Sequence, residues 1–170
     1  MSPELKKSGF LSDQELAAVL PEAGRLAAGP VAVIECIQDI PCNPCEAACH
    51  LAAITVGQPI TTPPLLDAGK CKGCGLCIAK CPGLAIFVVD ASGPGEFGTV
   101  QMPYEYWPAP VAGEVVVALD RRGSAVCQAT VNKVLLATGG DHTHSVTVTV
   151  PKVHVVEVRA IRYGGGIGDG

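Results

Sequence analysis

The sequence has few aromatic residues and no cluster of positive charge. Aromatic residues make up 4% of the 170, and the twelve Lys and Arg residues are scattered among sixteen Asp and Glu, for a net charge of −4. A surface that binds nucleic acid needs clustered Lys and Arg to contact phosphates, so nucleic acid is excluded as a partner. The longest run without a charged residue, 47–66, contains three prolines, which also excludes a membrane-spanning helix.

The first twenty residues also lack the continuous apolar stretch and the small-residue cleavage site of a secretory signal. The chain nevertheless has nine cysteines. Thiols stay free in the reducing cytosol, where clustered cysteines bind metal more often than they form disulfides. We therefore expect a cytoplasmic protein whose cysteines bind metal.

Composition divides the chain into four segments. Twenty Gly and fourteen Pro predict short elements joined by turns. In the first segment, Ser12 and Glu15 have the spacing of a capping box at the start of a short helix. We expect an N-terminal helical extension at 1–30, a cysteine-bearing unit at 31–94, a small antiparallel β-domain at 95–163 and a disordered Gly-rich tail at 164–170.

Valines that alternate with polar residues predict the strands of the β-domain. The segments with this pattern are 114–119, 124–134, 145–150 and 153–161. The sequence DRRG at 120–123 predicts a hairpin turn between the first two of them. We expect these strands to form a barrel or a sandwich.

The cysteine-bearing unit contains an internal repeat. A displacement of 32 residues superposes the last three cysteines of the first run on three cysteines of the second: Cys42, Cys45 and Cys49 fall on Cys74, Cys77 and Cys81. The register continues into the apolar segments AITV and AIFVV, which follow the two runs. Repetition at this scale predicts a duplicated α+β fold with pseudo-twofold symmetry.

The second run, CKGCGLCIAKCP at 71–82, has the ligand spacing of a [4Fe–4S] site. Three thiolates from a tight loop can take three corners of a cubane cluster, while the fourth cysteine, followed by Pro, reaches a different cluster. Gly73 and Gly75 allow the loop to fold closely and to direct backbone N–H groups at sulfur. A zinc site is the alternative, but zinc needs four thiolates, and this chain has seven cysteines in repeat register and Cys36 in addition.

Residues 31–90 resemble a bacterial-type ferredoxin that carries two [4Fe–4S] clusters, in which the two cysteine runs exchange their fourth ligands. The resemblance implies that one cluster is held by Cys49, Cys71, Cys74 and Cys77, and the other by Cys42, Cys45, Cys81 and one further ligand. The sequence departs from the family pattern at two positions. His50 stands where Pro is usual, and Asp39 stands where the further cysteine is expected.

Two residues compete to be this further ligand of the first cluster. Asp39 has the register position, whereas Cys36 lies three residues earlier and requires a longer loop. Thiolate is the softer and better ligand for the iron of such clusters, and a loop lengthened by three residues loses little closure entropy. We predict that Cys36 is the ligand; a vacant corner would instead leave a [3Fe–4S] centre.

The wider sequence, including GPVAVIECIQDIPCNPCEAAC and the segment PYEYWPAP, resembles the small ferredoxin-like subunits of bacterial and archaeal flavin-dependent dehydrogenase complexes. The resemblance implies flavin-containing partner subunits that oxidise an amino or imino acid, such as proline or hydroxyproline, or a related amine. The chain would relay single electrons from that flavoprotein through its two clusters and would not be an enzyme by itself. The alternatives are a free ferredoxin that serves several reductases and a zinc-stapled interaction module.

Overall fold

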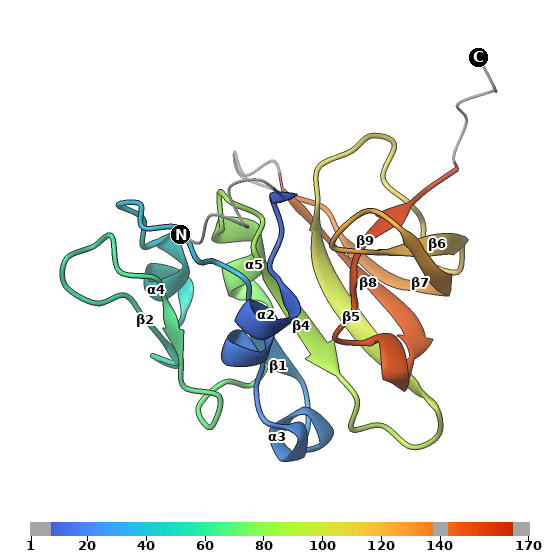
Figure 1. The fold of residues 1–170 in the computed structure, drawn as a ribbon. Coiled ribbons are helices and arrows are strands. Elements are labelled where there is room, and N and C mark those ends of the chain that lie inside the picture. Colours follow the sequence, from blue (N-terminus) through green and yellow to red (C-terminus); the bar gives the residue numbers. More distant parts are fainter. Residues whose placement is uncertain (1–7, 138–142, 165–170) are drawn as a thin grey trace.

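The computed structural model describes residues 8–137 and 143–164 of the chain, and Figure 1 shows their arrangement. The helices are α2 (Asp13–Val19), α3 (Ala23–Ala27), α4 (Pro44–Ala48), α5 (Leu76–Lys80) and the 3₁₀ helix η1 (Lys152–His154). The strands are β1 (Val31–Ile34), β2 (Ile54–Thr55), β3 (Leu65–Leu66), β4 (Ile86–Asp90), β5 (Phe97–Tyr104), β6 (Val115–Asp120), β7 (Ala125–Leu135), β8 (His144–Pro151) and β9 (Val158–Arg162). Apart from Gly164, the tail expected at 164–170 lies outside the described residues.

Seven of these strands form one antiparallel sheet in the order β1-β4-β5-β8-β7-β6-β9. Strand β4 of the cysteine-bearing unit pairs with β5, so backbone hydrogen bonding continues across the boundary expected between residues 94 and 95. The sheet curls, because β9 also contacts β5 although the two are far apart in the strand order. Strands β2 and β3 form a separate antiparallel pair beside α4 (Figure 1).

Strand β5 joins the two parts of the sheet, and it is not among the strands that the sequence predicts. Gly98 and Pro103 interrupt its pattern, since both residue types are depleted in strands. The side chains of β5 alternate between buried and more exposed positions. The side chains of its partner β8 alternate in the same way over most of that strand. Strand β1 is instead buried at all four positions. Helices α3 and α5 both contact β4, the neighbour of β1, so this part of the sheet lies in the middle of the molecule.

The predicted strand at 153–161 is wrong over its first half. Helix η1 ends at His154, and β9 begins only at Val158. The Glu157 N–H donates to the His154 carbonyl at 3.0 Å, which makes a turn between the two elements. This turn brings the chain from β8 to the edge of β6, with which β9 pairs.

The predicted capping box at the start of α2 is confirmed. The Glu15 N–H donates to the Ser12 hydroxyl at 3.4 Å, and the Ser12 N–H donates to the Glu15 carboxylate at 2.9 Å. None of the residues of α2, all of which the structure describes, is buried. Leu11, just before the cap, is 4% exposed and therefore anchors this part of the extension.

Elements of the cysteine-bearing unit recur at an interval of 32 residues. Helices α4 and α5 have the same length, and strand β1 pairs with β4 as β3 pairs with β2. Two non-glycine residues with left-handed backbone, Ala52 at φ 47° and Leu84 at φ 51°, are also separated by this interval. The starting residues that correspond are Pro44 and Leu76 for the helices and Ile54 and Ile86 for the strands. The repeat in the sequence therefore has a counterpart in local backbone geometry.

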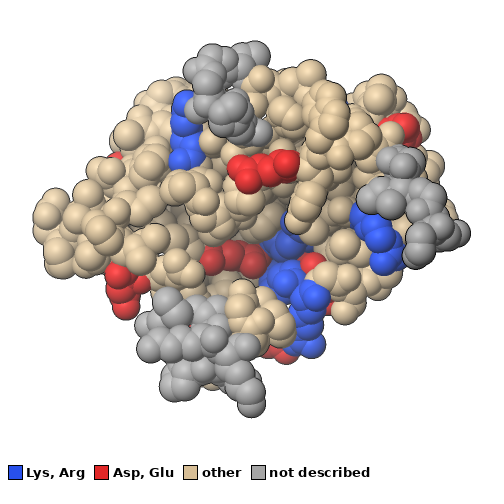
Figure 2. Space-filling view, turned by 90° about the horizontal axis from the view of Figure 1, so that it is seen from above, with Lys and Arg blue, Asp and Glu red and all other residues tan. Residues whose placement is uncertain are grey.

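The surface seen in Figure 2 is formed mostly by uncharged residues. Basic and acidic side chains are interspersed on this face, with no extended region of either sign. Across the described ranges, we find no helix with the length and apolar character needed to cross a bilayer.

Candidate metal centre

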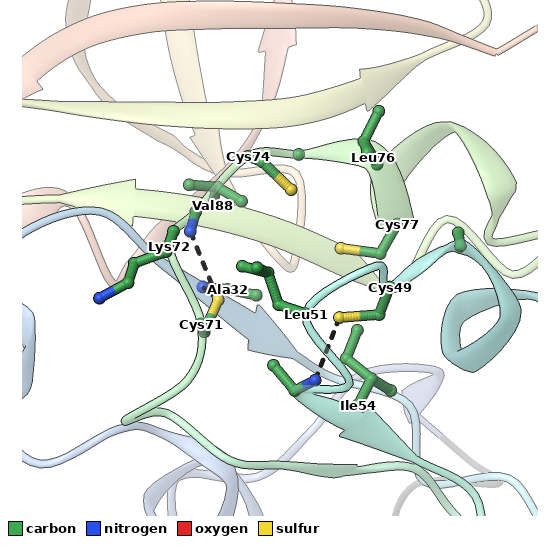
Figure 3. A pocket seen from close by; sticks show the side chains of 14 residues that line it. Ala32, Cys49, Leu51, Ile54, Cys71, Lys72, Cys74, Leu76, Cys77 and Val88 are labelled. Carbon is green, nitrogen blue, oxygen red and sulfur yellow. Dashed lines mark hydrogen bonds between the residues drawn. The ribbon is translucent and has the colours of Figure 1, made fainter.

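One pocket is lined by four cysteines, Cys49, Cys71, Cys74 and Cys77, and their sulfur atoms face a common space (Figure 3). Three of them come from the second cysteine run, while Cys49 is the last cysteine of the first run. Contact between α4 and α5 brings the two runs together. The rest of the wall is mostly apolar. We call these four residues the second cysteine set.

The other four cysteines of the two runs gather at a second place. Cys36, Cys42 and Cys81 line one pocket, and Cys45 lies close enough to feel the charges of all three. Cys81 belongs to the second run, so each set takes one residue from the opposite run. We call these residues the first cysteine set. Among the residues that the structure describes, no three or more His, Cys, Asp or Glu side chains are grouped to hold a single metal ion.

The two candidates for the further ligand of the first set lie in different places. Cys36 lines the pocket together with Cys42 and Cys81, and it is about half-buried. Asp39 is exposed and is not part of that pocket wall. The geometry therefore favours Cys36 over Asp39 as the residue that can reach a group bound there.

Backbone N–H groups point at the cysteine sulfurs. Ala32 and Gly73 donate to Cys71 Sγ, each at 3.4 Å. The repeat supplies an equivalent pair of bonds, from Ala53 to Cys49 at 3.3 Å and from Ala85 to Cys81 at 3.4 Å. Such bonds orient the sulfur atoms and stabilise the negative charge of a bound thiolate.

The two glycines of the second run adopt the left-handed conformation that the tight loop requires. Gly73 has φ +61° and Gly75 has φ +78°. A Cβ atom on Gly73 would lie 2.6 Å from Pro30 Cβ, and one on Gly75 would lie 2.6 Å from Gln101 Oε1. Both positions therefore favour glycine for backbone conformation. Space also requires it at Gly73, which meets the Pro30 ring and backbone, whereas at Gly75 the contact is with the movable amide end of Gln101.

Burial keeps the central thiols protonated in the cluster-free chain. It raises the pKa of Cys77 to about 12 and that of Cys45 to about 11, and it also raises the pKa of Cys36. Neighbouring cysteine charges add to the increase in each case. Because only thiolates bind iron, loading these sites must release protons.

Arg25 of α3 holds the loop that carries Cys71, a role that no motif in the sequence indicates. Its guanidinium donates to the carbonyls of Ala68 at 2.7 Å, Cys71 at 2.8 Å, and Gly29 and Pro30, both at 2.9 Å. The carbonyl groups that Arg25 contacts belong to residues as far as 46 positions along the chain, so no local sequence motif indicates these contacts. The N-terminal extension is therefore part of the support for the second cysteine set.

We expect Arg25→Gln to destabilise the chain by about 2–4 kcal/mol, because a short amide cannot replace several charge-assisted hydrogen bonds. Urea unfolding of the cluster-free protein would measure this loss, and Arg162→Gln is the matched control on an exposed side chain of β9. Equal unfolding midpoints for the two variants would contradict the role of Arg25.

Comparison with known proteins identifies the chemistry of this region. Residues 64–87, which contain the second cysteine run and β3, match the 4Fe-4S binding domain family. No curated protein and no solved structure matches the chain. The match supports a ferredoxin-type iron–sulfur domain with a role in electron transfer, and the four convergent thiols of the second set suit such a group.

Proposed function

We propose that the chain is the electron-transfer subunit of a flavin-dependent dehydrogenase complex and that it holds two [4Fe–4S] clusters. The observation that carries the proposal is the division of eight cysteines into two sets of four, each with one member from the opposite run. This division agrees with the ligand exchange expected of a two-cluster ferredoxin and so supports the proposal. Cys36 completes the first set in this assignment, and Cys49 completes the second.

The 32-residue recurrence of helices, strands and N–H···S bonds supports a dicluster ferredoxin arrangement with pseudo-twofold symmetry. When bound, each cluster accepts and returns single electrons. The protein supplies thiolates, directs backbone N–H groups at sulfur and surrounds the sites with apolar side chains. It offers the substrate no catalytic group in this proposal, so oxidation of an amino or imino acid takes place on the flavin-containing partner.

Exposed aromatic residues support a role as a subunit rather than as a free carrier. Tyr106 is 76% exposed and Trp107 is 81% exposed in the connection between β5 and β6. The Trp107 ring packs edge-on against His144 at the start of β8, so it sits on an ordered part of the sheet. Neighbouring exposed aromatic rings are typical of surfaces that bind another protein.

Iron and acid-labile sulfide analysis of the purified chain tests the proposal. We expect about eight of each per chain, as two [4Fe–4S] clusters require, with broad visible absorption that bleaches on reduction. Isolation of the tagged chain from its natural host should also yield a stoichiometric partner with a flavin spectrum. A colourless protein with zinc and no sulfide would establish the zinc-stapled module instead. A two-cluster chain that remains a monomer in its host would indicate a free ferredoxin.

A further inference from the structure

The pocket of the first cysteine set has an ion cluster in its wall, formed by Glu35, Arg121 and Arg159. Arg121 donates to the Glu35 carboxylate through Nε at 3.2 Å and through Nη2 at 3.1 Å. Arg159 donates to the same carboxylate through Nε at 2.5 Å. The three side chains are between 3% and 13% exposed, so the pair interactions are shielded from solvent.

These residues connect the C-terminal strands to the loop of the first set. Glu35 directly follows β1 and directly precedes Cys36, and its N–H donates to the Ala85 carbonyl at 2.8 Å. Arg121 lies in the turn between β6 and β7, and Arg159 lies on β9. Two residues of the β-domain, 86 and 124 positions after Glu35 in the chain, therefore hold the residue next to Cys36.

The ion cluster carries more positive than negative charge. The Glu35 carboxylate accepts hydrogen bonds from both guanidinium groups, an arrangement that favours its ionised form. Two guanidinium groups and one carboxylate leave an excess of one positive charge. Asp120 adds a second carboxylate to the same pocket wall, where it accepts hydrogen bonds from the backbone N–H groups of Arg122 and Ser124 within the turn. The excess of positive charge is therefore that of the three-residue ion cluster and not of the whole pocket wall.

Arg159 also has hydrogen-bonding capacity left over. Its guanidinium lies 4.9 Å from the centre of the Phe87 ring, which lines the same pocket. Nη1 donates to the Val155 and Val158 carbonyls, whereas within the described part of the chain Nη2 is buried with no hydrogen-bond partner. A buried donor without a partner is unfavourable, and negative charge placed nearby lowers that cost.

We propose that Glu35, Arg121 and Arg159 are positioning residues of the first cluster: they fix the start of the Cys36 loop, and their excess positive charge raises the reduction potential of that cluster. The inference rests on the proposed function, since it requires a cluster in the first cysteine set. Positive charge favours the reduced state because reduction adds one negative charge to the site.

The test is a redox titration of the intact protein, followed by electron paramagnetic resonance, with Arg121→Gln and Glu35→Gln variants. Removing a positive charge with Arg121→Gln should lower the ratio of reduced to oxidised first cluster about tenfold at a fixed applied potential, or about 59 mV for a one-electron couple. Removing the negative charge with Glu35→Gln should shift the first cluster in the opposite direction. The second cluster should not shift in either variant.

A purely structural role would not give shifts of opposite sign. Arg121→Lys keeps the charge and should keep the potential of the first cluster, even where the lost two-point contact lowers cluster retention. If Arg121→Gln loses the cluster, Glu35→Gln still measures the charge effect, with Arg121→Lys as the variant of unchanged charge. Unchanged potentials in both Gln variants, or a shift with Arg121→Lys as large as with Arg121→Gln, would overturn the inference. Iron and sulfide for a single cluster in the unaltered protein would instead overturn the proposed function.

Discussion

Replacing Cys36 with Ser should remove or convert the first cluster and leave the second one intact. Cys36 shares its pocket wall with Cys42 and Cys81, and serine is a harder and poorer ligand for cluster iron than thiolate. We expect the variant to lose about half of its iron and sulfide, or to show the signal of a [3Fe–4S] centre if three ligands still hold the cluster. Iron and sulfide analysis together with electron paramagnetic resonance would distinguish these two products.

Two controls make the assignment specific to Cys36. Asp39→Ala should keep both clusters, because Asp39 is exposed and does not line the pocket. Cys127→Ser should also keep both, because Cys127 lies on β7 outside both cysteine sets. Loss of the first cluster in Asp39→Ala, with normal content in Cys36→Ser, would show that the carboxylate is the ligand.

Replacing Gly73 with Ala should abolish the second cluster. The alanine methyl group would lie 2.6 Å from Pro30 Cβ and 2.7 Å from the Pro30 carbonyl carbon, and the backbone there cannot move without displacing β1. The left-handed conformation adds roughly 1–2 kcal/mol of strain. To remove this clash, either Pro30 or the Gly73 backbone, whose N–H donates to Cys71 Sγ, must move. Either movement displaces the cysteine ligands of the second set.

Iron content and urea unfolding would measure the effect of Gly73→Ala, and we expect a stability loss of about 2–4 kcal/mol in the cluster-free chain. Gly24→Ala is the matched control, because a Cβ atom there meets nothing within 4 Å and the position is inside helix α3. The control should be neutral or slightly stabilising, since Ala favours helix more than Gly does. Normal iron content in Gly73→Ala would contradict the close packing of the loop against Pro30.

The cysteine runs could be interpreted from sequence because their chemistry is local. In CKGCGLCIAKCP, a cubane cluster requires closely spaced cysteines and a tight loop with glycines, and both are visible within twelve residues. The match of residues 64–87 to a 4Fe-4S binding domain agrees with the interpretation of this run as an iron–sulfur site. The capping box at Ser12 is local in the same sense. The 32-residue repeat was also visible, because it keeps residue types in register along the chain.

Other features depend on contacts between distant segments, and only the tertiary structure decided them. The sequence predicted Cys36 over Asp39 from ligand softness alone, and only the path of the loop shows that Cys36 lies on the pocket wall and Asp39 does not. The pairing of β4 with β5 makes one sheet from segments that composition separates, and the glycine and proline in β5 hid that strand. Strand β9 is shorter than its valine pattern predicts, because the chain must first turn to reach β6.

The arginines show the same limit most clearly. The neighbours of Arg25 and Arg159 in the sequence suggest no role for them, and those of Arg121 suggest only its place in a turn. An arginine is usually a solvated surface residue. Folding brings Arg25 to the Cys71 loop and brings the other two to Glu35 across 86 and 124 residues. The sequence by itself determined where cysteines with the spacing of iron–sulfur ligands stand in the chain. The tertiary structure decided which residues hold those atoms in place and set the charge around them, because burial and pairing of charges arise only when distant strands meet.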